Sequence, residues 1–113
     1  MNKYRNRKIT YNGEVYDSVK EYRRHDELKI LEKTGQITNL QRQVPFELIP
    51  KQRNSTGKVE ERACNYIADF VYEQDGQQIV EDVKGYKKGA AYNIFTIKRK
   101  LMLYVYGIKI NEV

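Results

Sequence analysis

The sequence predicts a mixed α/β domain, an α+β mixed sheet in which a helix, three strands, a second helix and a last strand follow a small N-terminal β-hairpin. Three observations predict this order. Residues 18–35 and 92–107 carry helix caps and apolar residues at helical spacing. Between them lie three segments with the composition or alternation of strands. Asn12-Gly13 and Asp75-Gly76 each indicate a two-residue type I′ turn, because both central residues of that turn need positive φ.

The 113 residues predict one domain with three parts. Residues 1–8 are polar and basic and predict an arm, residues 9–16 predict the hairpin, and residues 17–112 predict the core. In the core, Ser18 and Glu21 form a capping box that opens the first helix, which Gly35 ends by supplying positive φ. A partial apolar stripe on this helix is expected to face the core: Val19, Tyr22, Leu28 and Leu31.

The rest of the core alternates strands with loops. Residues 37–49 predict a strand in which Pro45 marks an edge, a bulge or the strand start, because proline cannot donate to a ladder. Residues 51–62 are polar and predict a mobile loop, and residues 66–72 and 78–84 predict the central hairpin. The last helix should end at Gly107, and residues 108–110 predict a short final strand. The side of that helix expected to face the core carries Tyr92, Phe95, Arg99, Met102 and Val105.

The Asp75-Gly76 turn fixes the register of the central hairpin, and this register places Asp69 directly opposite Asp82. Two carboxylates about 5 Å apart repel by roughly 3 kcal/mol at an effective dielectric constant of about 20. A divalent cation between them would turn the repulsion into coordination, since hard cations take carboxylate oxygens. The same face is expected to carry Ile67, Val71, Val80 and Lys84.

Two alternatives stay open at this hairpin. Glu81 competes with Asp82, although the register places Glu81 opposite Phe70 on the other face; a bulge would reverse this. Without a metal, Lys84 would form an interstrand salt bridge with the two aspartates. Glu21 likewise has a structural explanation, as the residue that reaches back to the helix cap, and a functional one, as a further metal ligand.

Charge and composition limit the partners. The net charge is +6, and seven basic residues but no acidic one lie between residues 84 and 111, which favours a phosphate backbone as partner. Ten tyrosines add rings that can stack on bases. A single cysteine, Cys64, excludes an internal disulfide, and together with the lone His25 it is expected to be structural. No apolar run is long enough to span a membrane, and a cytoplasmic location is expected.

The pattern Ala68-Asp69 followed by Asp82-Val83-Lys84, within an αβββαβ order, resembles the PD-(D/E)xK nuclease superfamily, which has the restriction-endonuclease-like fold. Alanine replaces the usual proline, and aspartate the usual glutamate. The phrases QVPFELIP, YIADFVY, VEDVKG and IKRKLM resemble a group of small phage-encoded proteins akin to Holliday-junction resolvases.

This resemblance implies an endodeoxyribonuclease that uses Mg²⁺, or Mn²⁺ in its place, to hydrolyse branched DNA. Asp69 and Asp82 would bind the metal, with Glu21 and the Val83 carbonyl completing the set. Lys84 would orient or deprotonate the attacking water, or stabilise the transition state. A four-way junction has local twofold symmetry, so a homodimer is expected. The residues expected to contact DNA are Lys87, Lys88, Lys98, Lys100 and Arg53, whereas Arg99 is expected to be structural.

Two other classes of function compete. A DNA-binding accessory protein for recombination or replication, without catalysis, needs only the basic clusters and the tyrosines. A nuclease or nickase of another DNA or RNA structure would present the same metal site and the same basic surface. Cleavage assays separate the first class from the nucleases, and competition with RNA duplex separates the second.

Overall fold

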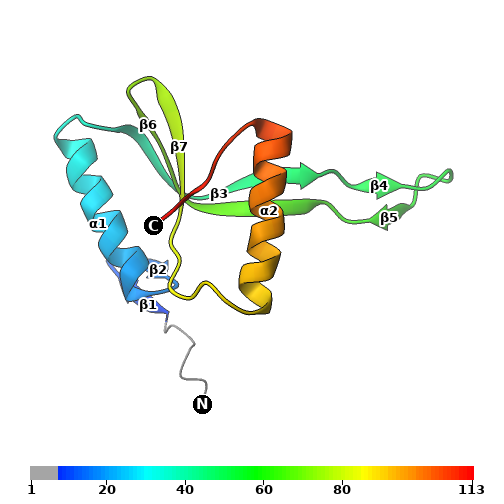
Figure 1. The fold of residues 1–113 in the computed structure, drawn as a ribbon, viewed down its shortest axis with the longest axis horizontal. Coiled ribbons are helices and arrows are strands. Elements are labelled where there is room, and N and C mark those ends of the chain that lie inside the picture. Colours follow the sequence, from blue (N-terminus) through cyan, green and yellow to red (C-terminus); the bar gives the residue numbers. More distant parts are fainter. Residues whose placement is uncertain (1–7) are drawn as a thin grey trace, which may run out of the picture.

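A four-stranded mixed sheet with strand order β3-β6-β7-β8 lies between two helices (Figure 1). The computed structural model describes residues 8–113, so residues 1–7 of the predicted basic arm lie outside the described residues. The expected αβββαβ order is present after the N-terminal hairpin, with one extra hairpin between the first two strands of the sheet. The elements are β1 (Ile9–Tyr11), β2 (Glu14–Tyr16), α1 (Val19–Lys33), β3 (Thr38–Ile49), β4 (Gln52–Arg53), β5 (Val59–Glu61), β6 (Cys64–Gln74), β7 (Gln77–Asp82), α2 (Ala90–Tyr106) and β8 (Asn111–Glu112).

Helix α1 begins and ends as predicted. The Ser18 hydroxyl accepts a hydrogen bond from the Glu21 amide over 3.1 Å, and Gly35 follows the helix with a φ of 83°. Leu28 of the predicted stripe is fully buried in the core, but Val19 is 45% exposed, and Glu21 and His25 are buried on the same helix. The apolar pattern therefore predicts only the C-terminal half of the buried face, because polar side chains occupy its N-terminal half.

The central hairpin has the predicted register. Asp75 and Gly76 adopt φ values of 52° and 78°, as a type I′ turn requires, and Phe70 pairs with Glu81. Strand β3 is an edge of the sheet, which explains how Pro45 is accommodated within it. Strand β8 runs parallel to β7.

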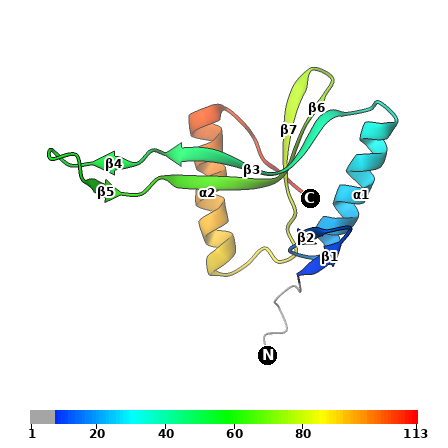
Figure 2. The same cartoon turned by 180° about the vertical axis from the view of Figure 1, so that it is seen from behind.

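The prediction of a final strand at residues 108–110 was wrong by three positions. These residues lead from the end of α2 back to the sheet, and Ile110 is buried in the core on the way. Pairing with β7 begins only at Asn111 because this connection must first span the distance from the helix to the sheet. The C-terminal end therefore lies near the middle of the molecule, between the two helices, in both views (Figure 1, Figure 2).

In both β3 and β6, the even-numbered residues point to one side of the sheet in one part of the strand and to the other side in the rest. The change occurs at the same place in the two paired strands. Arg42 pairs with Phe70 and Val44 pairs with Ala68, which leaves Gln43 facing Asp69. On one side of this pair, Val44 and Ala68 belong to the core cluster beneath α2; on the other side, Phe70 belongs to the cluster beneath α1. The sheet thus turns at Gln43 and Asp69, and each helix covers a different face.

This change of side corrects one prediction. Ile67 does not share a face with Asp69, Val71 and Val80; it is 55% exposed, whereas Val71 and Val80 are buried beneath α2. Alternation along β6 fails between Ala68 and Phe70, opposite Gln43 of β3, whose backbone is left-handed.

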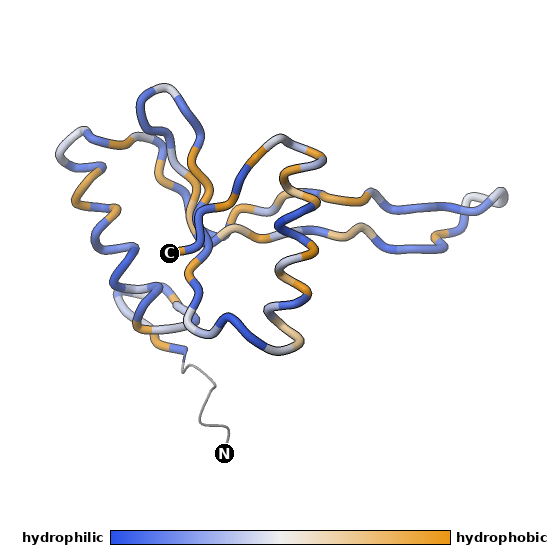
Figure 3. The backbone as a smooth tube through the Cα atoms, viewed as in Figure 1, coloured by the Kyte–Doolittle hydropathy of each residue, from blue (hydrophilic) through white to orange (hydrophobic). Residues whose placement is uncertain are grey.

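Residues 51–62 form a defined arm and not the predicted loop. Strands β4 and β5 pair beyond the end of the sheet, and the arm projects from the body of the molecule (Figure 1). Its tip is held by Asn54, whose side-chain oxygen accepts hydrogen bonds from the amides of Thr56 (2.9 Å) and Lys58 (3.0 Å). Most of the arm is hydrophilic, in contrast to the strands near α2 (Figure 3).

Helix α2 buries Phe95 and Met102 against the sheet and ends at Gly107, whose φ of 68° supplies the predicted left-handed cap. Its other side leaves apolar residues exposed, including Ile94 and Ile97. Within residues 8–113, no helix combines the length and the apolar composition that crossing a membrane requires.

Candidate metal centre

Asp69 lies where the ladder between β6 and β7 ends. Phe70 and Glu81 form the last backbone pair on this side of the hairpin, so Asp69 and Asp82 occupy the next facing positions. Beyond them the ladder is replaced by a side chain: Oδ2 of Asp69 accepts a hydrogen bond from the Val83 amide over 2.7 Å. The carboxylate of Asp69 is thereby fixed beside the backbone that leads from Asp82 to Lys84.

Asp82 is buried and held from two directions. Its Oδ2 accepts a hydrogen bond from the Tyr66 hydroxyl over 2.7 Å, and its Oδ1 lies 2.7 Å from Nζ of Lys84. The same Nζ lies 3.5 Å from the centre of the Phe95 ring, which adds a cation–π contact. Asp82 and Lys84 therefore face α2 together, as the sequence predicted.

Glu21 reaches the same place from the first turn of α1. It is 2% exposed, and its Oε2 accepts a hydrogen bond from the Asp17 amide over 3.1 Å. Glu21 thus reaches back toward the helix cap as expected, but to the residue before the cap residue Ser18. The same carboxylate also lies 3.5 Å from Nη2 of Arg42 and accepts a hydrogen bond from the side-chain amide of Gln43. One side chain therefore serves both the helix cap and the candidate site.

Three carboxylates converge at this point. Oxygens of Asp17, Glu21 and Asp69 all lie within 4.8 Å of one another. Asp82 is not one of this group; its oxygens contact Tyr66 and Lys84, and its charge acts on Asp69. The structure thus brings Glu21 to Asp69 and Lys84 to Asp82.

The electrostatics of Asp69 are unfavourable. Burial and the neighbouring Asp82 charge, with Glu21 also contributing, raise the pKa of Asp69 to about 8, although the hydrogen bond from the Val83 amide acts in the opposite direction. Glu21 has Arg42 beside it and Asp82 has Lys84. Among residues 8–113, no lysine, arginine or histidine forms an ion pair with Asp69. This partly buried carboxylate is therefore left without a compensating positive charge.

Glu81 points to the other face, as the register predicted. Its carboxylate accepts hydrogen bonds from Nε (2.8 Å) and Nη2 (2.6 Å) of Arg24 and another from the Tyr72 hydroxyl. The hydrogen bonds to Glu81 raise the pKa of Arg24, and burial followed by the Glu81 contact raises that of Tyr72 to about 12. These contacts give Glu81 a complete structural role, and its carboxylate does not face Asp69.

The donor set fits a hard divalent cation. Carboxylate oxygens are the ligands that Mg²⁺ and Mn²⁺ prefer, and at least two of these carboxylates lie within reach of one ion. Asp69 lacks the positive charge that such an ion brings. The Val83 amide faces Asp69, while a role for the Val83 carbonyl stays a prediction.

The predicted DNA-binding residues lie on three elements. Lys87 and Lys88 are exposed on the segment that follows β7, next to the site, and Nζ of Lys87 lies 3.9 Å from Glu112. Lys98 and Lys100 lie on α2, and Arg53 lies on the arm. These residues therefore come from three separate parts of the fold.

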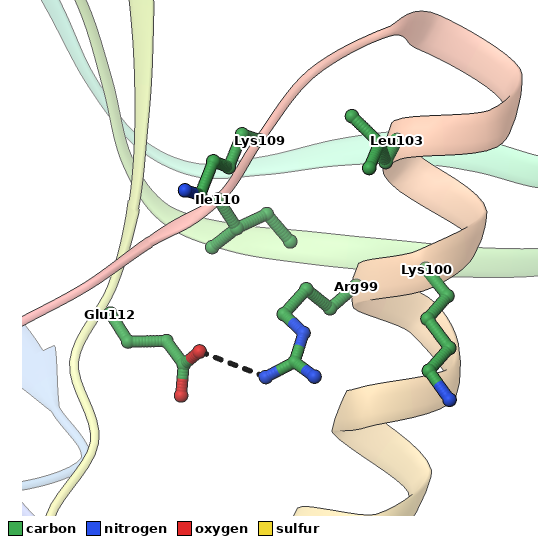
Figure 4. Close-up of a pocket in the computed structure, with 6 residues that line it drawn as sticks. All are labelled: Arg99, Lys100, Leu103, Lys109, Ile110 and Glu112. Atoms are coloured by element: carbon green, nitrogen blue, oxygen red, sulfur yellow. Dashed lines mark hydrogen bonds and ion pairs between the residues drawn. The ribbon is translucent and has the colours of Figure 1, made fainter.

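A pocket of about 460 Å³ lies between α2 and the C-terminal strand. Arg99 reaches across it to Glu112, with Nη1 3.0 Å from Oε2, whereas Lys100 extends along the side of the helix (Figure 4). The Tyr92 hydroxyl donates to the other oxygen of Glu112 over 2.8 Å. Arg99 therefore has the structural role that was predicted. The pocket is lined by Arg99, Lys100, Leu103, Lys109, Ile110 and Glu112.

Sequence reasoning did not identify four residues of this site: Asp17, Arg42, Gln43 and Tyr66. Asp17 precedes the helix cap, where acidic residues are common for structural reasons. The change of side in β3 and β6 leaves Tyr66 beneath α2, where it reaches Asp82, and Arg42 on the side of α1, where it reaches Glu21. No pattern in the sequence indicates that change.

The whole chain was compared with known proteins. Residues 1–111 match a family described as Protein of unknown function (DUF1064). No curated protein and no solved structure matches the chain.

Proposed function

The chain belongs to the DUF1064 family, whose function is unknown, and we propose that it is a Mg²⁺-dependent endodeoxyribonuclease that acts on branched DNA, with Mn²⁺ able to replace Mg²⁺. The order αβββαβ and the residues Asp69, Asp82 and Lys84 support the resemblance to PD-(D/E)xK nucleases. In this proposal the substrate is DNA, and the protein acts in the cytoplasm.

One observation carries the proposal. Asp69 is held between Asp82 and Glu21 without a basic partner among the described residues, and its pKa is raised to about 8. A purely structural sheet gains nothing from such a cluster, since an unbalanced, partly buried carboxylate opposes folding. A divalent cation would supply the missing charge, which makes the cluster useful only when the ion is bound.

In this proposal, Glu21, Asp69, Asp82 and the Val83 carbonyl hold the ion. When bound, Mg²⁺ would neutralise charge that develops on the phosphate oxygens and would lower the pKa of water. The Tyr66 hydroxyl fixes one oxygen of Asp82 and so sets the direction of its carboxylate.

Lys84 contributes a positive charge at the same face, steadied by the Phe95 ring. Its ammonium would orient the attacking water or stabilise the negative charge of the transition state. Because Nζ lies 2.7 Å from Asp82, it is already placed beside the carboxylate that would bind the ion.

The exposed cations would hold the DNA backbone outside this site. We assign that role to Lys87, Lys88, Lys98, Lys100 and Arg53. A four-way junction presents two equivalent strands, so we propose a homodimer with two matched sites. Helix α2 offers exposed apolar side chains for such an interface, including Ile97 (59% exposed) and Tyr104 (88% exposed).

One observation favours a second candidate, a DNA-binding accessory protein without catalysis. Lys84 forms a salt bridge with Asp82, two residues before it in the chain, and a structural role alone could account for this contact. That candidate leaves Asp69 unexplained, since the contact compensates Asp82 and not Asp69.

The test is cleavage of a labelled four-way junction and of linear duplex with the same sequence, with Mg²⁺ or Mn²⁺, by the wild-type chain, Asp82→Asn and Lys84→Met. We expect symmetric cuts in the junction, lost in both variants, while Lys84→Met still binds metal. Cutting of both substrates would keep the nuclease and remove the specificity for branched DNA. Tight binding without cutting would support the accessory protein, and cleavage of RNA duplex would redirect the proposal to RNA.

A further inference from the structure

Gln43 lies directly across the sheet from Asp69. The neighbouring pairs, Arg42 with Phe70 and Val44 with Ala68, place it there, and its side chain is exposed at the rim of the acidic cluster. At this position β3 changes the side to which its residues point. The feature that turns the strand is therefore also the neighbour of the carboxylate that lacks a positive partner.

The backbone of Gln43 is left-handed, with a φ of 53°. Among residues 8–113, three other residues besides glycine have positive φ: Asn12, Asn39 and Asp75. Asparagine and aspartate tolerate this region because their short side chains bond the local backbone, and glutamine has no such advantage. Something other than local preference must compensate for a glutamine at this position.

The side chain of Gln43 shows what that compensation is. Its Nε2 lies 3.3 Å from Oδ1 of Asp69 and 3.5 Å from Oε1 of Glu21. An amide NH₂ has two N–H donors, so one group can donate to both carboxylates. Without such a donor, the two like charges would repel each other across this gap.

We propose that Gln43 is a positioning residue of this site: its amide holds the carboxylates of Glu21 and Asp69 at one point, so that a divalent cation meets them together. The left-handed backbone is what aims the amide at both oxygens. This inference rests on the metal site of the proposed function and adds a group that is not itself required as a ligand. Residues that orient metal ligands in this way typically influence metal affinity by roughly 10–100-fold.

The test uses Gln43→Gly and a matched control, Asn39→Gly. Glycine suits positive φ at both positions, so both variants should fold. Both residues belong to β3, but the side chain of Asn39 bonds Gln41 and does not reach the cluster. Mn²⁺ binding is measured without DNA, by calorimetry and by electron paramagnetic resonance, together with the melting temperature of each chain without metal.

We expect Gln43→Gly to weaken Mn²⁺ binding by roughly 10–100-fold without lowering the melting temperature, and Asn39→Gly to bind like the wild type. Equal affinity in all three chains would overturn the proposal and leave Gln43 as a residue that only shapes the strand. Equal weakening in both variants would also overturn it, because the effect would then come from β3 as a whole.

The outcomes separate this inference from the proposed function. If the wild-type chain binds Mn²⁺, Gln43→Gly binds it weakly and no DNA is cut, the positioning role stands and the nuclease does not. If the wild-type chain binds no Mn²⁺ at all, the metal site and the role of Gln43 both fall.

Discussion

Replacing Asp69 by asparagine should make the metal-free protein more stable while it abolishes metal binding. Asparagine has nearly the same shape, and its side-chain oxygen can still accept the hydrogen bond from the Val83 amide. The substitution removes a negative charge that burial and Asp82 disfavour. A residue that serves only the fold would behave in the opposite way, since removing it would destabilise the protein.

The magnitude follows from the pKa of Asp69, which rises from an ordinary 3.8 to about 8. Each unit corresponds to about 1.4 kcal/mol, so the ionised carboxylate opposes folding by at most roughly 5–6 kcal/mol near pH 8. Loss of a charged acceptor for the Val83 amide offsets roughly 1.5–3 kcal/mol. We expect Asp69→Asn to raise the free energy of unfolding by roughly 2–4.5 kcal/mol at pH 7.5, and the melting temperature by about 8–18 °C.

The pH dependence has a definite sign. Because the pKa of Asp69 is raised in the folded state, the carboxyl contributes its full stability below pH 4, where it is protonated. That contribution is lost as the pH rises toward 8. The wild-type chain without metal should therefore lose stability between about pH 4 and pH 8, and the advantage of Asp69→Asn should disappear toward pH 4.

The assay is thermal unfolding followed by circular dichroism in EDTA at several pH values. Asp75→Asn is the matched control, because Asp75 is exposed in the hairpin turn and asparagine suits its positive φ. It should leave both the stability and its pH dependence nearly unchanged. With Mg²⁺ present, the wild-type chain should gain stability and Asp69→Asn should not. A variant that is less stable than the wild type at pH 7.5 in EDTA would refute the reasoning.

Two further predictions concern residues outside the cluster. Glu81→Gln should lower the free energy of unfolding by about 2 kcal/mol, because Arg24 loses its charged hydrogen-bond acceptor. It should leave Mn²⁺ affinity unchanged, and a loss of affinity with normal stability would show that the assigned register is wrong. Replacing residues 52–61 by a two-residue turn should keep the melting temperature and metal binding but weaken DNA binding and reduce its dependence on salt, since the arm carries cations beyond the core. Unchanged DNA affinity in filter binding at several salt concentrations would remove the arm from the interface.

Local signals predicted the parts of this fold that local geometry determines. The Asp75-Gly76 turn gave the register of β6 and β7 because a two-residue turn leaves one pairing. From that register came the faces of Asp82 and Glu81, one toward α2 and the other toward Arg24. The helix ends followed from Ser18 and from the glycines that follow each helix.

The missed features depend on contacts between distant segments. Strand β8 starts where the chain leaving α2 first reaches β7, and the preceding residues do not encode that distance. The arm exists because the chain continues as a pair of strands beyond β3 and β6, away from the core. The sequence of the arm nevertheless has the composition of a loop. No sequence pattern predicts the turn at Gln43, because glutamine has no preference for positive φ.

The most direct test of the central claim is a crystal of the wild-type chain soaked in Mn²⁺, with anomalous diffraction used to locate the ion. We expect one peak within bonding distance of the carboxylates of Asp69 and Asp82, with Glu21 as a direct or water-mediated neighbour. The same soak of Asp82→Asn should give no peak there. A wild-type crystal with no ion at Asp69, or with ions only elsewhere on the surface, would contradict the account.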